Sequence, residues 1–168
     1  MSVSSLEASA PPVRRNLFTA WAPTLGWLCV LAAFSSDLFS AEHTGSILEK
    51  VLHALFGEIS RSRFDAIHFL VRKTAHFCSY GALSALAFFA WRATLPAWKA
   101  WSFRWSGLAL LLTLFAASAD EFHQSFVPSR TASPRDVALD MVGAVFFQVA
   151  VAIGLRLFWR DKSGGARN

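Results

Sequence analysis

The chain has 168 residues, of which 54% are hydrophobic and 16% are charged, and its formal net charge is +5. A soluble domain usually carries about 25% charged residues, so the composition argues against a soluble protein and indicates one compact membrane domain. The basic residues are scattered among apolar blocks instead of forming the single stripe that is typical of a nucleic-acid binder. We therefore expect no nucleic-acid partner, and an anionic lipid surface is the more natural counter-charge.

The N-terminal segment, residues 1–16, is rich in Ser, Ala and Pro and is predicted to be a disordered tail. Two arginines at its end precede an apolar run over residues 17–34. This run is longer than the ~7–15 residues that form the apolar part of a signal peptide. It therefore favours a membrane span over a secretory or twin-arginine signal.

Four apolar runs are long enough to cross a bilayer, whose hydrocarbon core of ~30 Å needs about 20 residues of helix. They cover residues 17–34, 74–91, 101–119 and 137–158. We therefore expect an all-α protein, with a four-helix transmembrane bundle over residues 17–158 and a basic C-terminal tail over residues 159–168. Ser133 and Pro134 suit the N-cap and the first turn of the last helix.

A shorter amphipathic segment separates the first two predicted spans. Residues 45–60 carry apolar side chains at helical spacing, interrupted by polar ones, and are too short and too polar to cross the membrane. The pattern predicts a short amphipathic helix that lies on the outer interface. A helix packed over the mouth of the bundle is an alternative that is compatible with the first.

Four spans place both chain termini on the same side of the membrane. Lys and Arg are slightly more frequent in the segments on that side, whereas most acidic residues fall on the other side. Because basic segments are retained in the cytoplasm, this bias predicts a multi-pass protein with its N- and C-termini inside.

Polar residues gather where the predicted spans reach the outer side. Lys73, His76 and Tyr80 share one helical face at the start of the second span, because they are spaced i, i+3 and i+7. The other members of this set are Asp120, Glu121, His123 and Gln124 after the third span, Arg130 in the next connection, and Asp136 and Asp140 at the start of the fourth. Ionisable groups at membrane depth usually face the interior and pair with one another. The set is therefore either an ion-pair network that holds the helices together or a functional polar pocket.

Two stretches of the sequence resemble the VanZ-like family of small bacterial integral membrane proteins. They are KTAHFCSYGALSA and DEFHQSFVPSRTASPRDVALDMVGA, and the similarity extends over roughly residues 17–155. The shared pattern is Lys-x-x-His-x-x-x-Tyr, then Asp-Glu-x-x-Gln, an Arg, and an Asp that leads into a last helix containing a Gly. The matching positions are Lys73, His76, Tyr80, Asp120, Glu121, Gln124, Arg130, Asp136 and Gly143. Asp140 departs from the pattern, which has an Asn there, and we expect Lys73 or Arg130 to neutralise it.

The resemblance implies a compartment and a general role. The family is named for a member linked to resistance to the glycopeptide teicoplanin. This implies a protein of the bacterial cytoplasmic membrane that acts at its outer face, on or with envelope lipids or cell-wall precursors. The implied partners are membrane lipid and a polyprenyl phosphate or peptidoglycan precursor.

The residues themselves leave several chemistries open. Lys73, His76 and Arg130 could hold a phosphate. A membrane-embedded hydrolase or transferase could use His76 or His123 as nucleophile or general base. A structural protein held together by ion pairs needs no reaction at all, so the sequence does not decide whether the protein is an enzyme.

A metal site is the weakest of these chemistries. The candidate zinc ligands are His68, His76, Glu121 and His123. Glu121 and His123 are spaced i, i+2, so they do not face the same way on a helix, and no HExxH-like spacing occurs. We predict no metal and no other cofactor.

Overall fold

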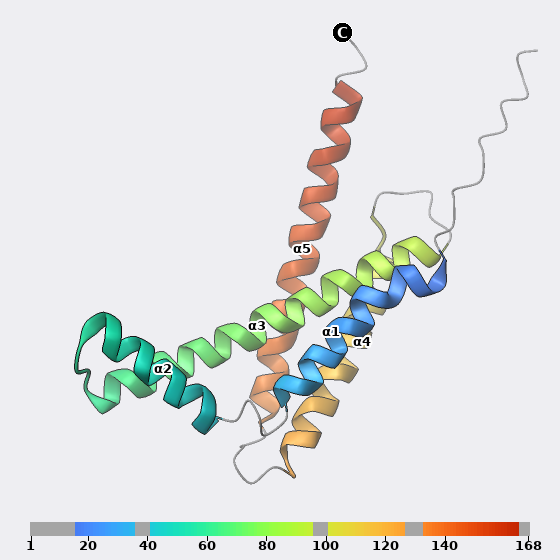
Figure 1. Cartoon of the computed structure of the whole chain (residues 1–168). Helices are drawn as coiled ribbons and strands as arrows, with labels where there is room; N and C mark the ends of the chain where they lie inside the picture. The colour runs from blue at the N-terminus through green and yellow to red at the C-terminus, as the bar shows by residue number, and fades with distance from the viewer. Residues whose placement is uncertain (1–15, 36–40, 96–100, 127–132, 165–168) are drawn as a thin grey trace, which may run out of the picture.

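The computed structural model describes residues 16–35, 41–95, 101–126 and 133–164 of the chain. Within these ranges it contains helices and no strand, which confirms the predicted all-α class (Figure 1). The five helices are α1 (Leu17–Ser35), α2 (Ala41–Phe56), α3 (Arg61–Thr94), α4 (Phe103–Gln124) and α5 (Pro134–Gly164). Because α5 continues to Gly164, the first part of the predicted basic tail is helical. Residues 1–15 and 165–168 of the predicted tails lie outside the described residues.

The second predicted span is only the middle part of a longer helix. α3 begins at Arg61 instead of residue 74, and its first turns are too polar to be found by a search for apolar length. These turns lie against α2, and Leu52 of α2 and Phe64 of α3 are both buried. A Cβ on Gly45 would lie 3.4 Å from the His68 ring, so α2 and α3 approach closely there.

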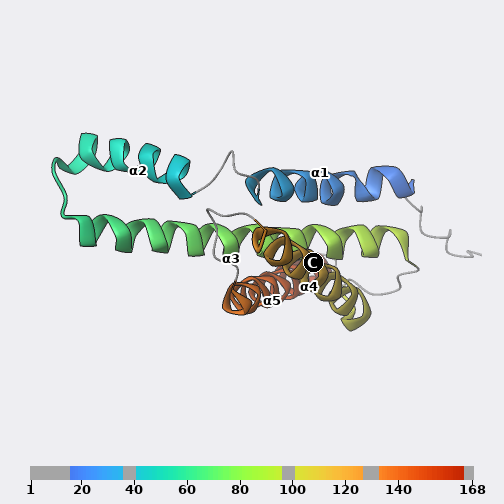
Figure 2. The same cartoon turned by 90° about the horizontal axis from the view of Figure 1, so that it is seen from below.

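The predicted amphipathic helix is present as α2, although it spans Ala41–Phe56 instead of residues 45–60. Gly57 follows it with a φ of 73°, a left-handed conformation that glycine adopts without strain. The Gly57 N–H donates to the carbonyl of His53 at 2.9 Å and so closes the helix. Figure 2 shows α2 beside the N-terminal part of α3 and apart from α4 and α5. Its location at a membrane interface stays a prediction.

α3 is the central helix, and α1, α4 and α5 all pack against it. α1 lies alongside the C-terminal part of α3, whereas α5 crosses α3 at a steep angle (Figures 1 and 2). The indole N–H of Trp27 on α1 donates to the carbonyl of Ser79 on α3 at 2.9 Å. Between α3 and α4, the rings of Phe88 and Trp105 meet edge to face with their centres 6.0 Å apart, inside a fully buried cluster.

Small residues allow α5 to approach α3 closely. A Cβ at Gly143 would overlap the carbonyl oxygen of Phe77, which belongs to the backbone of α3. Further along, the Gln148 side-chain amide donates to both the carbonyl and the hydroxyl of Ser84 at 2.8 Å. Close backbone approach combined with interhelical hydrogen bonds is how helices associate in a membrane, where the hydrophobic effect does not hold them together.

Two helices are long and apolar enough to cross a membrane: α1, over Leu17–Ser35, and the Pro134–Phe158 part of α5. α3 and α4 contain more polar residues within their apolar stretches and do not meet the same test. Many large apolar side chains on α5, including Val142, Phe146, Val149 and Ile153, are exposed on the outside of the fold. These features indicate a membrane protein, and the four-span arrangement stays a prediction.

Candidate functional site

Two side-chain pairs join α3 to α5. The Lys73 ammonium forms an ion pair with Asp136 Oδ1, and both side chains are partly buried. One turn further along each helix, His76 Nδ1 lies 3.3 Å from Asp140 Oδ1. Because the partners follow each other in the same order on both helices, α3 and α5 run in the same direction through this contact.

A hydrogen-bonded group joins α3 to α4. The Tyr80 hydroxyl donates to Asp120 Oδ2 at 2.8 Å, and the Gln124 amide donates to the same oxygen at 3.1 Å. Asp120 and Gln124 share a face of α4 because they are spaced i, i+4. The two donors hold the Asp120 carboxyl in one orientation and help to compensate its charge.

Glu121 joins α4 to the beginning of α5. Its Oε2 accepts a hydrogen bond from the backbone N–H of Ser133 at 2.7 Å, and its side chain is only 7% exposed. The Ser133 hydroxyl accepts from the Arg135 N–H at 3.2 Å, which confirms the predicted N-cap. Glu121 lies just after the apolar run over residues 101–119. Burial raises the pKa of its carboxyl, and the hydrogen bond from the Ser133 N–H partly opposes that rise.

The end of α1 completes the polar region. Ser35 Oγ and His123 Nδ1 lie 3.4 Å apart, which connects the last residue of α1 to the last turn of α4. The C-terminal ends of α1 and α4 therefore lie next to the start of α5 and the middle of α3. The prediction that polar helix ends meet on one side of the molecule agrees with this arrangement.

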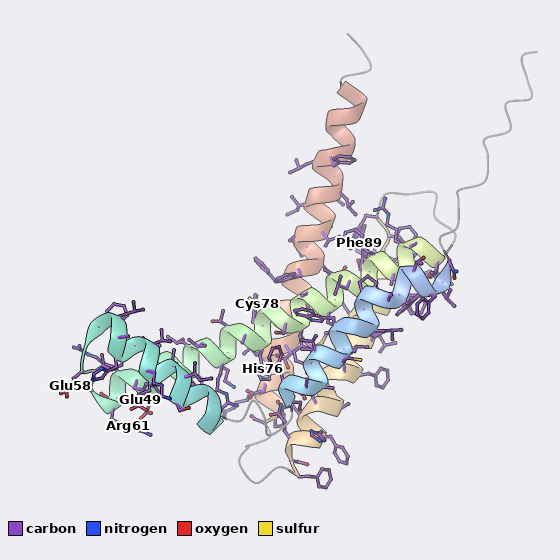
Figure 3. The ribbon with its side chains drawn as sticks, in the orientation of Figure 1. Glu49, Glu58, Arg61, His76, Cys78 and Phe89 are labelled. Atoms are coloured by element: carbon purple, nitrogen blue, oxygen red, sulfur yellow. The ribbon has the colours of Figure 1, made fainter. Side chains whose placement is uncertain are left out.

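A cleft of about 240 Å³ lies between α1, α3 and α4. Its wall combines apolar with polar side chains, and His76 lies on the stretch of α3 that α5 crosses (Figure 3). Its lining includes Leu31, Phe34, Val71, Arg72, His76, Tyr80, Asp120 and Gln124. A second cleft of about 300 Å³ shares Leu31, Tyr80 and Asp120 with the first and reaches His123. The two clefts therefore lie next to each other near the end of α1.

Asp140, the departure from the family pattern, is completely buried. Neither of its carboxyl oxygens has a hydrogen-bond partner among the described residues, and its neighbour is His76. Lys73 pairs with Asp136 instead, and Arg130 lies outside the described residues, so neutralisation of Asp140 by Arg130 stays a prediction. A buried carboxylate without partners is costly, so the nearby His76 ring is an important part of the surroundings of Asp140.

The structure places the predicted site residues in separate contacts that involve α3, α4 and α5, and their shared role as a functional site stays a prediction. Arg130 lies outside the described residues, and all the others take part in the contacts given above. Lys73 and Asp136 pair with each other and do not line the cleft of about 240 Å³, whereas Arg72, which is not among the predicted site residues, does. The i, i+4 spacing of Arg72 and His76 on α3 was the signal that would have found it.

The candidate zinc ligands are not gathered in one place. His68 packs against the ring of Phe64 with the ring centres 5.7 Å apart, at the α2 contact. His123 lines the second cleft, beside Ser35. Within the described ranges, no group of three or more His, Cys, Asp or Glu residues is placed to hold a metal ion.

A family model described as VanZ/LLP1 matches residues 19–155. The chain belongs to the VanZ/LLP1 family. The matched range runs from α1 into the last part of α5 and contains every residue of the candidate site, including Arg130. The VanZ-like resemblance of the two quoted motifs is thereby confirmed. No curated protein and no solved structure matches the chain.

Proposed function

We propose that this VanZ-like protein crosses the bacterial cytoplasmic membrane four times and binds an envelope lipid, or a lipid-linked cell-wall precursor, in its polar cleft at the outer face. The directions of α1, α3, α4 and α5 support the four crossings. α1 ends at Ser35 and the last turn of α4 contains His123, and both lie beside the start of α5. This is expected if successive spans cross the membrane in alternating directions. Both termini would then be cytoplasmic.

The mixed lining of the cleft is the observation that supports a lipid ligand. Leu31, Phe34 and Val71 provide an apolar wall, whereas Arg72 and Asp120 provide charges in the same cleft. A lipid has the same division between an apolar chain and a polar head group. A water-soluble ligand would gain little from the apolar wall, and a purely apolar ligand would leave the charges without partners.

The α2–α3 hairpin supports the placement at an interface. Ile47, Val51 and Leu55 form an exposed apolar stripe on α2 at i, i+4 and i+8. Lys50 and the exposed arginines at the start of α3 lie on the same hairpin. Apolar side chains next to basic ones suit a helix that rests in the head-group region of an anionic membrane.

Filling the cleft tests the proposed function. Ala75 lines the cleft and is exposed, so Ala75→Phe blocks the cleft without overpacking a core. Ala66→Phe is the matched control, because Ala66 is an exposed alanine on the same helix outside the cleft. We expect lipid to remain bound to the wild type and to Ala66→Phe through purification in mild detergent, and to be lost from Ala75→Phe, as measured by native mass spectrometry.

A cellular assay accompanies the binding measurement. Cells that lack the protein should become more sensitive to teicoplanin or to envelope stress, and Ala66→Phe should restore growth while Ala75→Phe should not. Full lipid retention together with full complementation by Ala75→Phe would refute the proposed role of the cleft.

A further inference from the structure

The positive and negative side chains of the cleft lie at opposite ends of it. Arg72, His76 and Tyr80 follow one another at i, i+4 and i+8 on α3, so they cover about 12 Å of helix at 1.5 Å per residue. Arg72 lies at one end, and Tyr80 holds Asp120 at the other. The cleft is therefore positive at one end and negative at the other.

Arg72 is the cation available to a ligand in this cleft. Among the described residues, Arg61 pairs with Asp65, Lys73 pairs with Asp136 and His76 lies beside Asp140, and none of these contacts involves Arg72. Its side chain is partly exposed and lines the cleft. A guanidinium presents paired N–H donors that match the oxygens of a phosphate.

Asp120 is the anion available at the other end. Its contacts on Oδ2 are the neutral donors Tyr80 and Gln124, and no described Lys or Arg forms an ion pair with it. Two neutral donors orient the carboxylate and leave its negative charge without a cationic partner. An ammonium group that donates hydrogen bonds would supply that partner.

We propose that the cleft between α1, α3 and α4 binds a zwitterionic phospholipid head group that carries a primary amine, of the phosphoethanolamine kind. Its phosphate is held by Arg72 and its ammonium by Asp120, while Leu31, Phe34 and Val71 contact the apolar part of the lipid. A purely anionic head group would place its negative charge against Asp120. The proposal rests on the proposed lipid-binding function and narrows it to one class of head group.

The test uses the full-length protein in nanodiscs whose main lipid is phosphatidylcholine. Equal small amounts of phosphatidylethanolamine and phosphatidylglycerol with identical acyl chains are added, and the lipids retained by the protein are quantified by native mass spectrometry. We expect phosphatidylethanolamine to be enriched about ten-fold or more over both other lipids, since a charge-assisted hydrogen bond changes affinity on that scale.

Four variants separate the two ends of the cleft. Asp120→Asn keeps an acceptor for Tyr80 and Gln124, so the fold should be retained, and it should abolish the preference for phosphatidylethanolamine. Arg72→Gln should weaken retention of all phospholipids about ten-fold. The matched controls, Arg63→Gln and Asp65→Asn, alter exposed charges on α3 outside the cleft and should leave the preference unchanged.

The outcomes distinguish this proposal from the proposed function. Enrichment of phosphatidylglycerol equal to or above that of phosphatidylethanolamine would overturn the head-group assignment and leave lipid binding intact. A full preference for phosphatidylethanolamine in Asp120→Asn would also overturn it. If the wild type retained no more of any phospholipid than Ala75→Phe retains, the proposed function would fail together with this inference.

Discussion

Gly143 is the point at which the packing of α5 on α3 depends most directly on one residue. A Cβ there would overlap the Phe77 carbonyl oxygen and lie 3.0 Å from its carbonyl carbon. Non-bonded heavy atoms have their best separation at about 3.5 Å or more, and the overlap with the oxygen is the tightest contact, so Gly143→Ala requires the helices to separate locally by roughly 1 Å. The obstacle is backbone, which cannot rotate away as a side chain can.

The cost of this separation can be compared with the gain from alanine. Overpacking of this kind usually costs about 1–3 kcal/mol, whereas Gly→Ala in a helix interior gains up to about 1 kcal/mol. We therefore expect Gly143→Ala to lower the free energy of unfolding by about 1–2 kcal/mol. The shift should also move Asp140 away from His76, because Asp140 lies one turn before Gly143 on α5.

Gly154 provides the matched control on the same helix. A Cβ there would meet nothing within 4 Å, so Gly154→Ala should be neutral or stabilising by up to about 1 kcal/mol. Reversible unfolding in bicelles measures both variants under the same conditions. If Gly143→Ala were as stable as Gly154→Ala, the close approach of α5 to α3 would not exist and this reasoning would be refuted.

Three further predictions concern the charged groups and the topology. Lys73→Met should destabilise the protein by about 2–4 kcal/mol, because it leaves Asp136 partly buried and unpaired. Adding Asp136→Leu should restore most of the melting temperature. A double variant as unstable as the single one would contradict the pairing. Glu121→Gln keeps an acceptor for the N–H before α5 and should melt near the wild type, whereas Glu121→Ala should lose about 1–2 kcal/mol, measured by thermal unfolding in detergent. Single cysteines introduced by Ala10→Cys and Gly165→Cys in a cysteine-free background should resist a membrane-impermeant thiol reagent in intact cells, and labelling of either one would exclude cytoplasmic termini.

Part of the site could be predicted from the sequence because it depends on local spacing. Lys73, His76 and Tyr80 lie on one face of α3 wherever that helix is placed, since the helical repeat alone determines it. The N-cap at Ser133 likewise depends only on neighbouring residues, and the structure confirms it. The apolar runs also indicated a helical membrane protein before any contact between the helices was known.

The contacts between helices were decided by the tertiary structure. The sequence shows that Lys73 and His76 face one way, but not that Lys73 meets Asp136 while His76 meets Asp140. That choice depends on where α5 crosses α3, and the two helices approach each other closely at Gly143.

The sequence by itself determined the helical class, the family and the residues that share each helical face. Only the tertiary structure showed that Arg72 lines the cleft and that the helix of the second span starts at Arg61. The physical reason is the difference between local and long-range interactions. Helical periodicity repeats within a few residues, whereas a cleft exists only after α1, α3 and α4, which are distant in the chain, have packed together.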